Sequence, residues 1–230
     1  MDIFYLLFLL TFIFTIVVQV KVSSTFNKYA HVASGAGRTG AEVARRILDA
    51  HGLFSVRIEH VRGHLSDHFD PRSNTLRLSD SVYGSSSASA VGVAAHEVGH
   101  AIQHAEKYAP VIWRGKLVPA VNFASRFSWI AILLGLLVGG VSTILGSYAI
   151  MAGIIMFAAT TLFHLVTLPC ELDASRRALT ELELCGWYSD GELGASKKVL
   201  RAAAMTYVAA LAMSLIQLLR LIRIFGNRRN

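Results

Sequence analysis

The stretch from residue 129 to residue 169 restricts this chain to folds that contain a membrane hairpin. Its 41 residues include no Asp, Glu, Lys or Arg, and His164 is its single histidine. As one helix the stretch would be roughly 60 Å long, about twice the thickness of a bilayer's hydrocarbon core. We therefore predict that it crosses a membrane twice, with the turn near residues 147–153.

Two other apolar stretches extend this prediction to about four transmembrane helices. Residues 3–20 carry no charge and lack the basic start and cleavage site of a secretory signal, so we expect a retained anchor. Residues 202–219 are also uncharged but short for a span, and an interfacial helix is the alternative. The composition, 53% hydrophobic and 16% charged, agrees with a membrane protein.

The basic residues point to lipid as a partner. The formal net charge is +7, but the Lys and Arg residues flank the apolar stretches and are not interleaved with aromatic residues. Anionic lipid headgroups fit this distribution better than nucleic acid does. We therefore expect the bilayer to be a partner of the chain, and no nucleic acid.

The polar region between the anchor and the hairpin predicts one small α+β domain. A capping box, alternating strands and a Ser-capped, Ala-rich run predict a helix over residues 41–50, strands over 54–61 and 75–79, and a helix over 87–107. The region has about 100 residues, which is enough for one such domain and too few for two.

The sequence His96-Glu97-Val98-Gly99-His100 falls within the last of these helices. Residues four apart share one helix face, so both imidazoles can bind one Zn²⁺. Glu97 lies about 100° around the helix from His96, where it can accept a proton from a water that the metal activates. The motif therefore predicts a zinc site with Glu97 as the base of a hydrolase; the alternative is two surface histidines on an amphipathic helix.

A hydrolytic zinc site needs a third protein ligand, and the residues leave more than one candidate. Glu171 follows the second crossing of the hairpin, which returns the chain to the side of the histidine helix. Its alternative is an ordinary interfacial carboxylate. His104 continues the histidine spacing, but it lies about 12 Å of helical rise from His96 and is better placed on the surface.

The segment from His60 to Asp70 is also rich in ligand types, including His64, Asp67 and His68. A glycine precedes most of these residues and a proline follows them, so helical pairing of the histidines is not expected. A loop held by its own carboxylates, or one that lines the cleft, is the favoured interpretation over a second metal site.

Three segments together resemble a known family: residues 63–71 (GHLSDHFDP), 94–104 (AAHEVGHAIQH) and 171–178 (ELDASRRA). They are similar to the YugP-like bacterial membrane zinc metallopeptidases, and the resemblance covers nearly the whole chain. More distantly, the arrangement resembles the HtpX-type and CAAX prenyl proteases.

The resemblance implies a fold and a ligand set. In the distant relatives a glutamate after a membrane hairpin begins an ExxxD motif and supplies the third zinc ligand, which would be Glu171 here. This chain has Ser175 where those relatives have the aspartate, so the task of that acid would pass to another residue such as Asp173. The fold implied is an α-helical membrane protein with a small α+β zincin-like catalytic domain.

On this interpretation the chain has five segments: an anchor (1–21), a zincin-like catalytic domain (22–128), the transmembrane hairpin (129–169), a third-ligand helical segment (170–201) and a last span with a basic tail (202–230). We expect one zinc ion, held by His96, His100 and Glu171, and hydrolysis of a peptide or membrane-protein substrate. A zinc-binding membrane scaffold or adaptor that cleaves nothing is the rival from another class.

Further roles near the site stay open. The oxyanion of a gluzincin-like reaction needs a donor besides the metal, and His68, His104 and Arg176 are the candidates. Extended substrate is expected to add to the strand around Leu76, Arg77 and Leu78 through main-chain hydrogen bonds.

The distribution of charge also gives an orientation. Lys21, Lys28 and Arg38 follow the first span, which places the catalytic region in the cytoplasm by the positive-inside rule. The arginines after Leu219 argue the reverse, but the basic residues before the last span nearly balance them. We therefore expect a multi-pass protein of the cell membrane with a cytoplasmic site.

Overall fold

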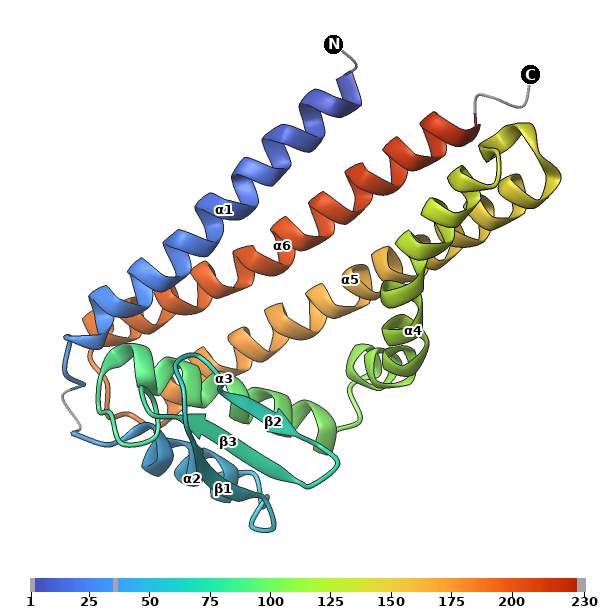
Figure 1. Ribbon diagram of the computed structural model, residues 1–230. Coiled ribbons are helices and arrows are strands. Elements are labelled where there is room, and N and C mark those ends of the chain that lie inside the picture. The colour runs from blue at the N-terminus through green and yellow to red at the C-terminus, as the bar shows by residue number, and fades with distance from the viewer. Residues whose placement is uncertain (1–2, 35–36, 227–230) are drawn as a thin grey trace. The chain divides into compact units, whose positions relative to one another are not determined.

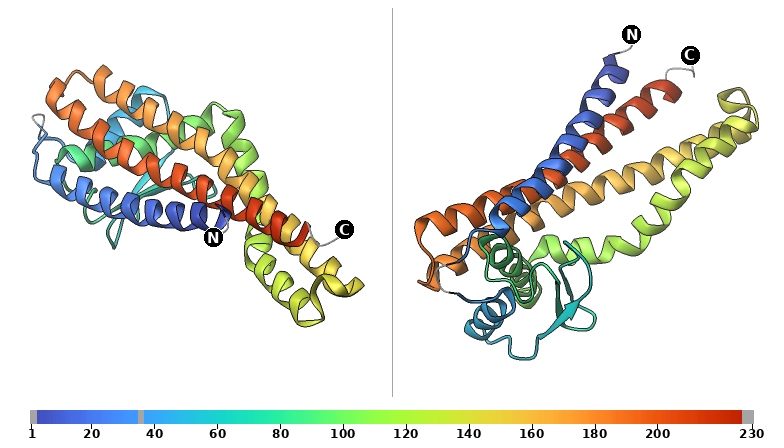
Figure 2. Two further views of the ribbon diagram at one scale, coloured as in Figure 1. Left: turned by 90° about the horizontal axis from the view of Figure 1, so that it is seen from above. Right: turned by 60° about the vertical axis from the view of Figure 1, so that its left-hand side comes forward.

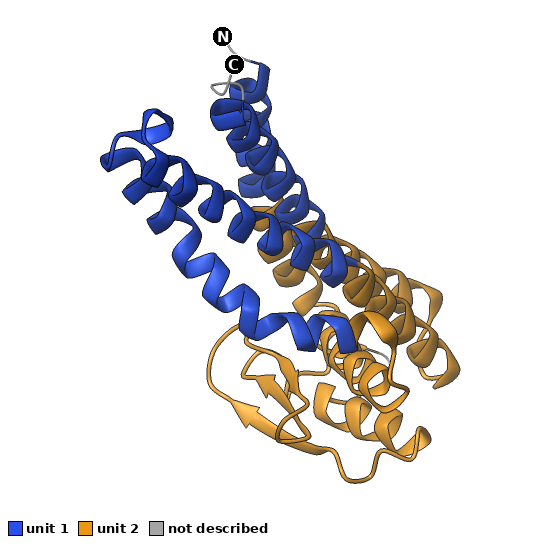
Figure 3. Cartoon of the chain, turned by 90° about the vertical axis from the view of Figure 1, so that its right-hand side faces the viewer, with its two compact units in different colours: residues 1–17, 112–168, 207–230 blue, residues 18–111, 169–206 orange. Residues whose placement is uncertain are grey.

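The computed structural model describes residues 3–34 and 37–226 (Figure 1). The elements in chain order are α1 (Ile3–Ala30), α2 (Gly40–Ala50), β1 (Arg57–Val61), β2 (His68–Asp70), β3 (Thr75–Ser79), α3 (Ala88–Ala105), α4 (Ala109–Leu137), the 3-10 turn η1 (Gly140–Ser142), α5 (Ile144–Leu184) and α6 (Asp190–Gly226). The chain forms two compact units (Figure 3): unit 1 comprises residues 1–17, 112–168 and 207–230, and unit 2 comprises residues 18–111 and 169–206.

Unit 1 is built from apolar helices. In the described part of the chain, α1, α4, α5 and α6 are each long and apolar enough to cross a membrane. Within the unit, α1 and α6 are antiparallel neighbours in both views of Figure 2. The Thr11 hydroxyl contacts the Met213 sulfur at 3.7 Å, and the Arg220 guanidinium lies 5.2 Å from the centre of the Phe8 ring.

The hairpin of unit 1 turns earlier than the sequence predicts. The expected turn at residues 147–153 is wrong, because these residues lie inside α5 and the turn falls between Leu137 and Ile144. Gly139 and Gly140 make that turn with φ values of +106° and +60°, which other residues rarely adopt. Gly153 on α5 instead allows α4 and α5 to pack closely, since a Cβ there would lie 2.7 Å from the Ser128 carbonyl oxygen of α4.

Unit 2 contains a three-stranded sheet in the order β1-β3-β2, parallel between β1 and β3 and antiparallel between β2 and β3. Leu76 on β3 is opposite Ile58 on one side and Phe69 on the other. Leu76 and Leu78 are completely buried in the core, which fixes the register of the sheet. Residues 68–70, expected as part of a loop, form the edge strand β2, because pairing with a distant strand overrides the local turn signals.

The two helices predicted for this unit are present. Thr39 and Glu42 form the complete capping box at the start of α2, and the Ser87 hydroxyl accepts a hydrogen bond from the Ala90 N–H at the start of α3. The buried side of α3 is rich in Ala and Gly. Small residues on this side allow the backbone of a neighbouring helix to come close, and this close approach forms the site.

Candidate metal centre

Three ligand atoms converge between α3 and the second half of α5, all inside unit 2. The Nε2 atoms of His96 and His100 lie 3.3 and 3.4 Å from Oε2 of Glu171. The three donors are within 4.8 Å of one another, and no other group of three His, Cys, Asp or Glu residues in the described chain meets this criterion. The Glu171 side chain is 2% exposed and both imidazoles are 13% exposed.

Gly99 permits the two helices to bring these ligands together. A Cβ at this position would lie 2.7 Å from the carbonyl oxygen of Ala174, a distance that real side chains do not show. Ala174 follows Glu171 by three residues, and Gly99 lies between the two histidines. The absence of a side chain at Gly99 therefore sets how closely α5 approaches the histidine face of α3.

The other ring nitrogen of each histidine has its own partner. Ser175 Oγ lies 3.1 Å from Nδ1 of His96, and Gln103 Oε1 lies 3.0 Å from Nδ1 of His100. An amide oxygen only accepts hydrogen bonds, so Nδ1 of His100 carries the proton and its Nε2 keeps a lone pair toward Glu171. This is the tautomer that binds a metal through Nε2, and such contacts normally orient ligating histidines.

Gln103 is in turn held by a buried network. Its side chain is completely buried, and Nε2 donates to the Cys170 carbonyl oxygen at 2.8 Å and to Asp173 Oδ2 at 2.9 Å. The Asp173 carboxylate also pairs with Arg176 and accepts a 2.6 Å hydrogen bond from Arg177 Nε. The network orients the Gln103 amide with its oxygen toward His100.

Two residues after Glu171 on α5 reach the histidines of α3. Ser175 contacts His96 directly, and Asp173 acts on His100 through Gln103. Gln103 is not among the site residues predicted from the sequence, although its position three residues after His100, on the same helix face, is a usable signal.

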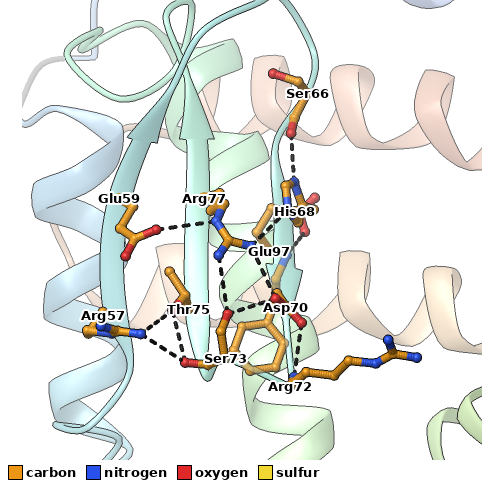
Figure 4. A network of polar contacts seen from close by, with 11 residues as sticks. Arg57, Glu59, Ser66, His68, Asp70, Arg72, Ser73, Thr75, Arg77 and Glu97 are labelled. Carbon is orange, nitrogen blue, oxygen red and sulfur yellow. Dashed lines mark hydrogen bonds and ion pairs between the residues drawn. The ribbon is translucent and has the colours of Figure 1, made fainter.

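The carboxylate of Glu97 lies beside the ligands and touches the sheet. Its Oε2 accepts a hydrogen bond of 3.1 Å from the backbone N–H of Phe69 on β2 (Figure 4). Burial raises the pKa of the Glu97 carboxyl above its usual value, and the neighbouring charges of His96 and His100 oppose this shift. A carboxylate with a raised pKa is a stronger base.

The three candidate oxyanion donors lie in different places. His68 pairs across the sheet with Arg77 and shares its outer face, whereas Phe69 is opposite the buried Leu76. Nδ1 of His68 also lies 2.9 Å from the Ser66 carbonyl oxygen (Figure 4). This placement does not support His68 as the donor.

The other two candidates are on the helices. The His104 ring packs 5.6 Å from the ring of Phe69, and the exposed Arg176 side chain pairs with Asp173. In the described structure, the His104 ring therefore packs against β2 and the Arg176 guanidinium binds a carboxylate, and neither contact selects one of them as the oxyanion donor.

The strand predicted to receive substrate cannot do so. Leu76, Arg77 and Leu78 belong to β3, the central strand, whose two edges are already paired with β1 and β2. The Arg77 side chain lies on the outer face and binds Glu59 and Asp70 (Figure 4). Adding a strand requires unpaired main-chain groups, which only the edge strands of this sheet offer.

Hydrogen bonds to carboxylates connect the segment after β1 with β3 and the residue that follows it. Asp67 accepts hydrogen bonds from the N–H and the hydroxyl of Ser79, and Asp80 accepts from the Gly63 N–H and contacts His60. Hydrogen bonds from the Ser73 hydroxyl and the Arg72 N–H lower the pKa of Asp70 to about 2. The predicted loop is therefore a loop only up to Asp67, and it is held by contacts with β3 and Asp80 as well as by its own carboxylates.

The fold and the site together define a class: a chain with several membrane-length apolar helices and a His-His-Glu group that could hold a metal ion. Residues 4–226 match the family described as "Putative neutral zinc metallopeptidase". The chain is 48% identical over 212 residues to the "Putative membrane protease YugP" of Bacillus subtilis (strain 168), which covers 92% of each sequence.

The chain belongs to this zinc metallopeptidase family, so the resemblance predicted from its three segments is confirmed. No solved structure matches the chain. Family membership supports protease function, zinc dependence and a membrane location at the level of the family.

Proposed function

We propose that the chain is a zinc-dependent endopeptidase of the gluzincin type, carried by a small zincin-like domain. The convergence of His96 Nε2, His100 Nε2 and Glu171 Oε2 is the observation that supports it most. Two imidazoles and one carboxylate are the donor set of hydrolytic zinc sites that keep one position open. The Nδ1 contact of His100 fits this ion because it leaves Nε2 available, and the Ser175 hydroxyl can accept a hydrogen bond from Nδ1 of His96 to give the same tautomer there.

The residues of the chain have separate tasks in this mechanism. His96, His100 and Glu171 would hold one zinc ion, which supplies a Lewis acid that polarises the scissile carbonyl and acidifies water. Glu97 accepts the proton of the attacking water and transfers it to the leaving amine. The Phe69 N–H holds the Glu97 carboxylate beside the ligands, and burial keeps that carboxylate basic.

The open edge of β2 is the place for an extended substrate. β2 is an edge strand, and Phe69 on it contacts Glu97. The Phe69 N–H is already bonded to Glu97, so an added peptide would use the other outward main-chain groups of this edge, such as the Phe69 carbonyl oxygen, and would pass the base and the ligands. The strand proposed to bind substrate is therefore β2 and not β3.

The proposed location is the cell membrane, with several crossings and the site in the cytoplasm. The four apolar helices and the basic residues after the first span support it. Peptides or membrane proteins near the bilayer surface are the proposed substrates.

The experiment compares purified wild type with Glu97→Gln, in zinc content and in cleavage of an unfolded protein such as casein. The substitution keeps the size of the side chain and removes the base, so we expect full zinc content and no cleavage. Cleavage at the wild-type rate by Glu97→Gln would refute the mechanism. A zinc-binding scaffold would show no cleavage by either protein.

A further inference from the structure

A cleft of unit 2 that is separate from the candidate metal centre lies along α2 and the outer edge of β1. Its volume is about 990 Å³. The residues that line it include Arg38, Arg46, Phe54, Ile58, Tyr83 and Trp187. None of the residues lining this cleft belongs to the candidate metal centre, so the proposed peptidase activity does not account for it.

The open edge of β1 forms one side of the cleft. β1 is an edge strand, and the Arg57 N–H donates to the Asn74 carbonyl oxygen at 3.2 Å, toward β3. Main-chain groups alternate along a strand, so those of Ile58 and His60 point to the open side. They offer donors and acceptors to an added strand.

Arg38 and Arg46 lie on the other side of the cleft. The guanidinium carbons of Arg38 and Arg46 lie 5.6 and 5.9 Å from the centre of the Trp187 ring. Within residues 3–34 and 37–226, neither guanidinium makes a hydrogen bond or an ion pair, although the charge of Arg38 helps to lower the pKa of the nearby Glu42 carboxyl. The aromatic ring holds both charges in place and leaves their N–H groups available to an anion.

The other charged groups of the cleft already have partners. Arg45 donates to the carbonyl oxygens of Val56 and Leu53 and pairs with Asp49. The Glu42 carboxylate accepts from the Thr39 N–H, and the Glu59 carboxylate pairs with Arg77. The available charge in the cleft is therefore positive.

Exposed aromatic side chains complete the surface. Phe54 is 72% exposed and Tyr83 is 37% exposed, and both line the cleft. A bound peptide would cover apolar surface here in addition to forming ion pairs.

We propose that this cleft binds an extended acidic segment of another protein, which adds to β1 as a strand and places carboxylates against Arg38 and Arg46. The open strand edge selects an extended peptide, and the two available guanidinium groups select acidic side chains. The surface is separate from the candidate metal centre and would hold a partner independently of cleavage.

The test uses the full chain in detergent with Trp113→Phe and Trp129→Phe, so that Trp187 is the single tryptophan. The probe is a fluorescein-labelled peptide of about ten residues that alternates Glu and Val, long enough to cover an edge strand. The matched peptide has Lys in place of Glu. We expect the Glu peptide to bind and to change the emission of Trp187, and the Lys peptide not to bind.

Two pairs of variants separate the contribution of the two arginines to peptide binding from that of the strand edge. Arg38→Glu with Arg46→Glu should weaken binding by about tenfold or more, because attraction becomes repulsion. Arg72→Glu, a charge reversal at an exposed arginine that does not line the cleft, should change it by less than about twofold. Ile58→Pro removes an outward N–H without breaking the β1–β3 ladder and should also weaken binding, whereas Ile58→Val should not.

Circular dichroism and the melting temperature, measured for every variant, report that the protein is folded. Equal binding of both peptides would overturn the proposal. An equal loss of affinity for the Glu peptide in the cleft variants and in their controls would also overturn it. Full competition by inorganic phosphate at the peptide's concentration would also overturn it, since the cleft would then be a general anion site. All these measurements are made without a cleavage assay, so their outcome is independent of the proposed peptidase function.

Discussion

The backbone N–H of Phe69 donates a hydrogen bond to the carboxylate of Glu97 across 3.1 Å. This contact joins the edge strand β2 to the helix that carries two of the three candidate metal ligands. The group proposed as the base is therefore positioned by the same strand that is proposed to receive the substrate.

Phe69→Pro tests this contact because proline has no N–H. The Phe69 N–H points to Glu97 rather than to β3, so the β2–β3 ladder should remain. We expect normal zinc content and a loss of cleavage of about tenfold or more, because Glu97 loses its partner. Phe69→Leu keeps the N–H and is the control; equal activity of the two variants would show that the hydrogen bond has no role.

Removal of a ligand should empty the site. We expect Glu171→Gln, His96→Ala and His100→Ala each to lower zinc affinity severely, because a three-ligand site is incomplete without one member. His104→Ala should retain zinc, since its ring packs against Phe69 rather than with the ligands. Metal analysis of the purified proteins measures the zinc content. Full zinc content in Glu171→Gln would show that Glu171 is not the third ligand.

Gln103→Leu should weaken zinc binding without removing a ligand. The substitution keeps the volume but removes the acceptor of the His100 Nδ1–H and leaves Asp173 with one donor fewer. Loss of such an orienting contact typically costs about 10–100-fold in metal affinity. Competition with a zinc chelator measures this loss, and Gln217→Leu, a similar substitution in unit 1, is the control.

Gly99→Val should separate α5 from the histidines. The first side-chain carbon would already lie 2.7 Å from the Ala174 carbonyl oxygen, and a backbone cannot move away as a flexible side chain can. Overpacking of this kind costs about 1–3 kcal/mol of stability. We expect a lower melting temperature together with lower zinc affinity, and Gly115→Val, where a Cβ meets nothing within 4 Å, serves as the control.

A cysteine at the exposed Arg72 position tests the orientation in the membrane. In a Cys170→Ala, Cys185→Ala background, Arg72→Cys would be the single cysteine of the chain. If unit 2 is cytoplasmic, a membrane-impermeant maleimide should label it only after the cells are opened. Rapid labelling of intact cells would reverse the proposed orientation.

Features of the fold that depend only on neighbouring residues could be predicted from the sequence. The capping box of Thr39 and Glu42, the Ser87 cap and the four apolar helices follow from local spacing and composition. The placement of His96 and His100 on one helix face follows from the helical period. Local hydrogen bonds and burial of an apolar stretch need no information from distant parts of the chain.

The pairing of distant segments could not be predicted from the sequence and is seen only in the folded chain. The tertiary structure placed the hairpin turn at Gly139 and Gly140, where left-handed backbone is required, and it put β3 in the centre of the sheet. It also joined Gln103 to Asp173, 70 residues later in the chain. Strand order and buried polar networks arise from contacts between segments that have no common local period, so the pattern along the sequence does not contain them.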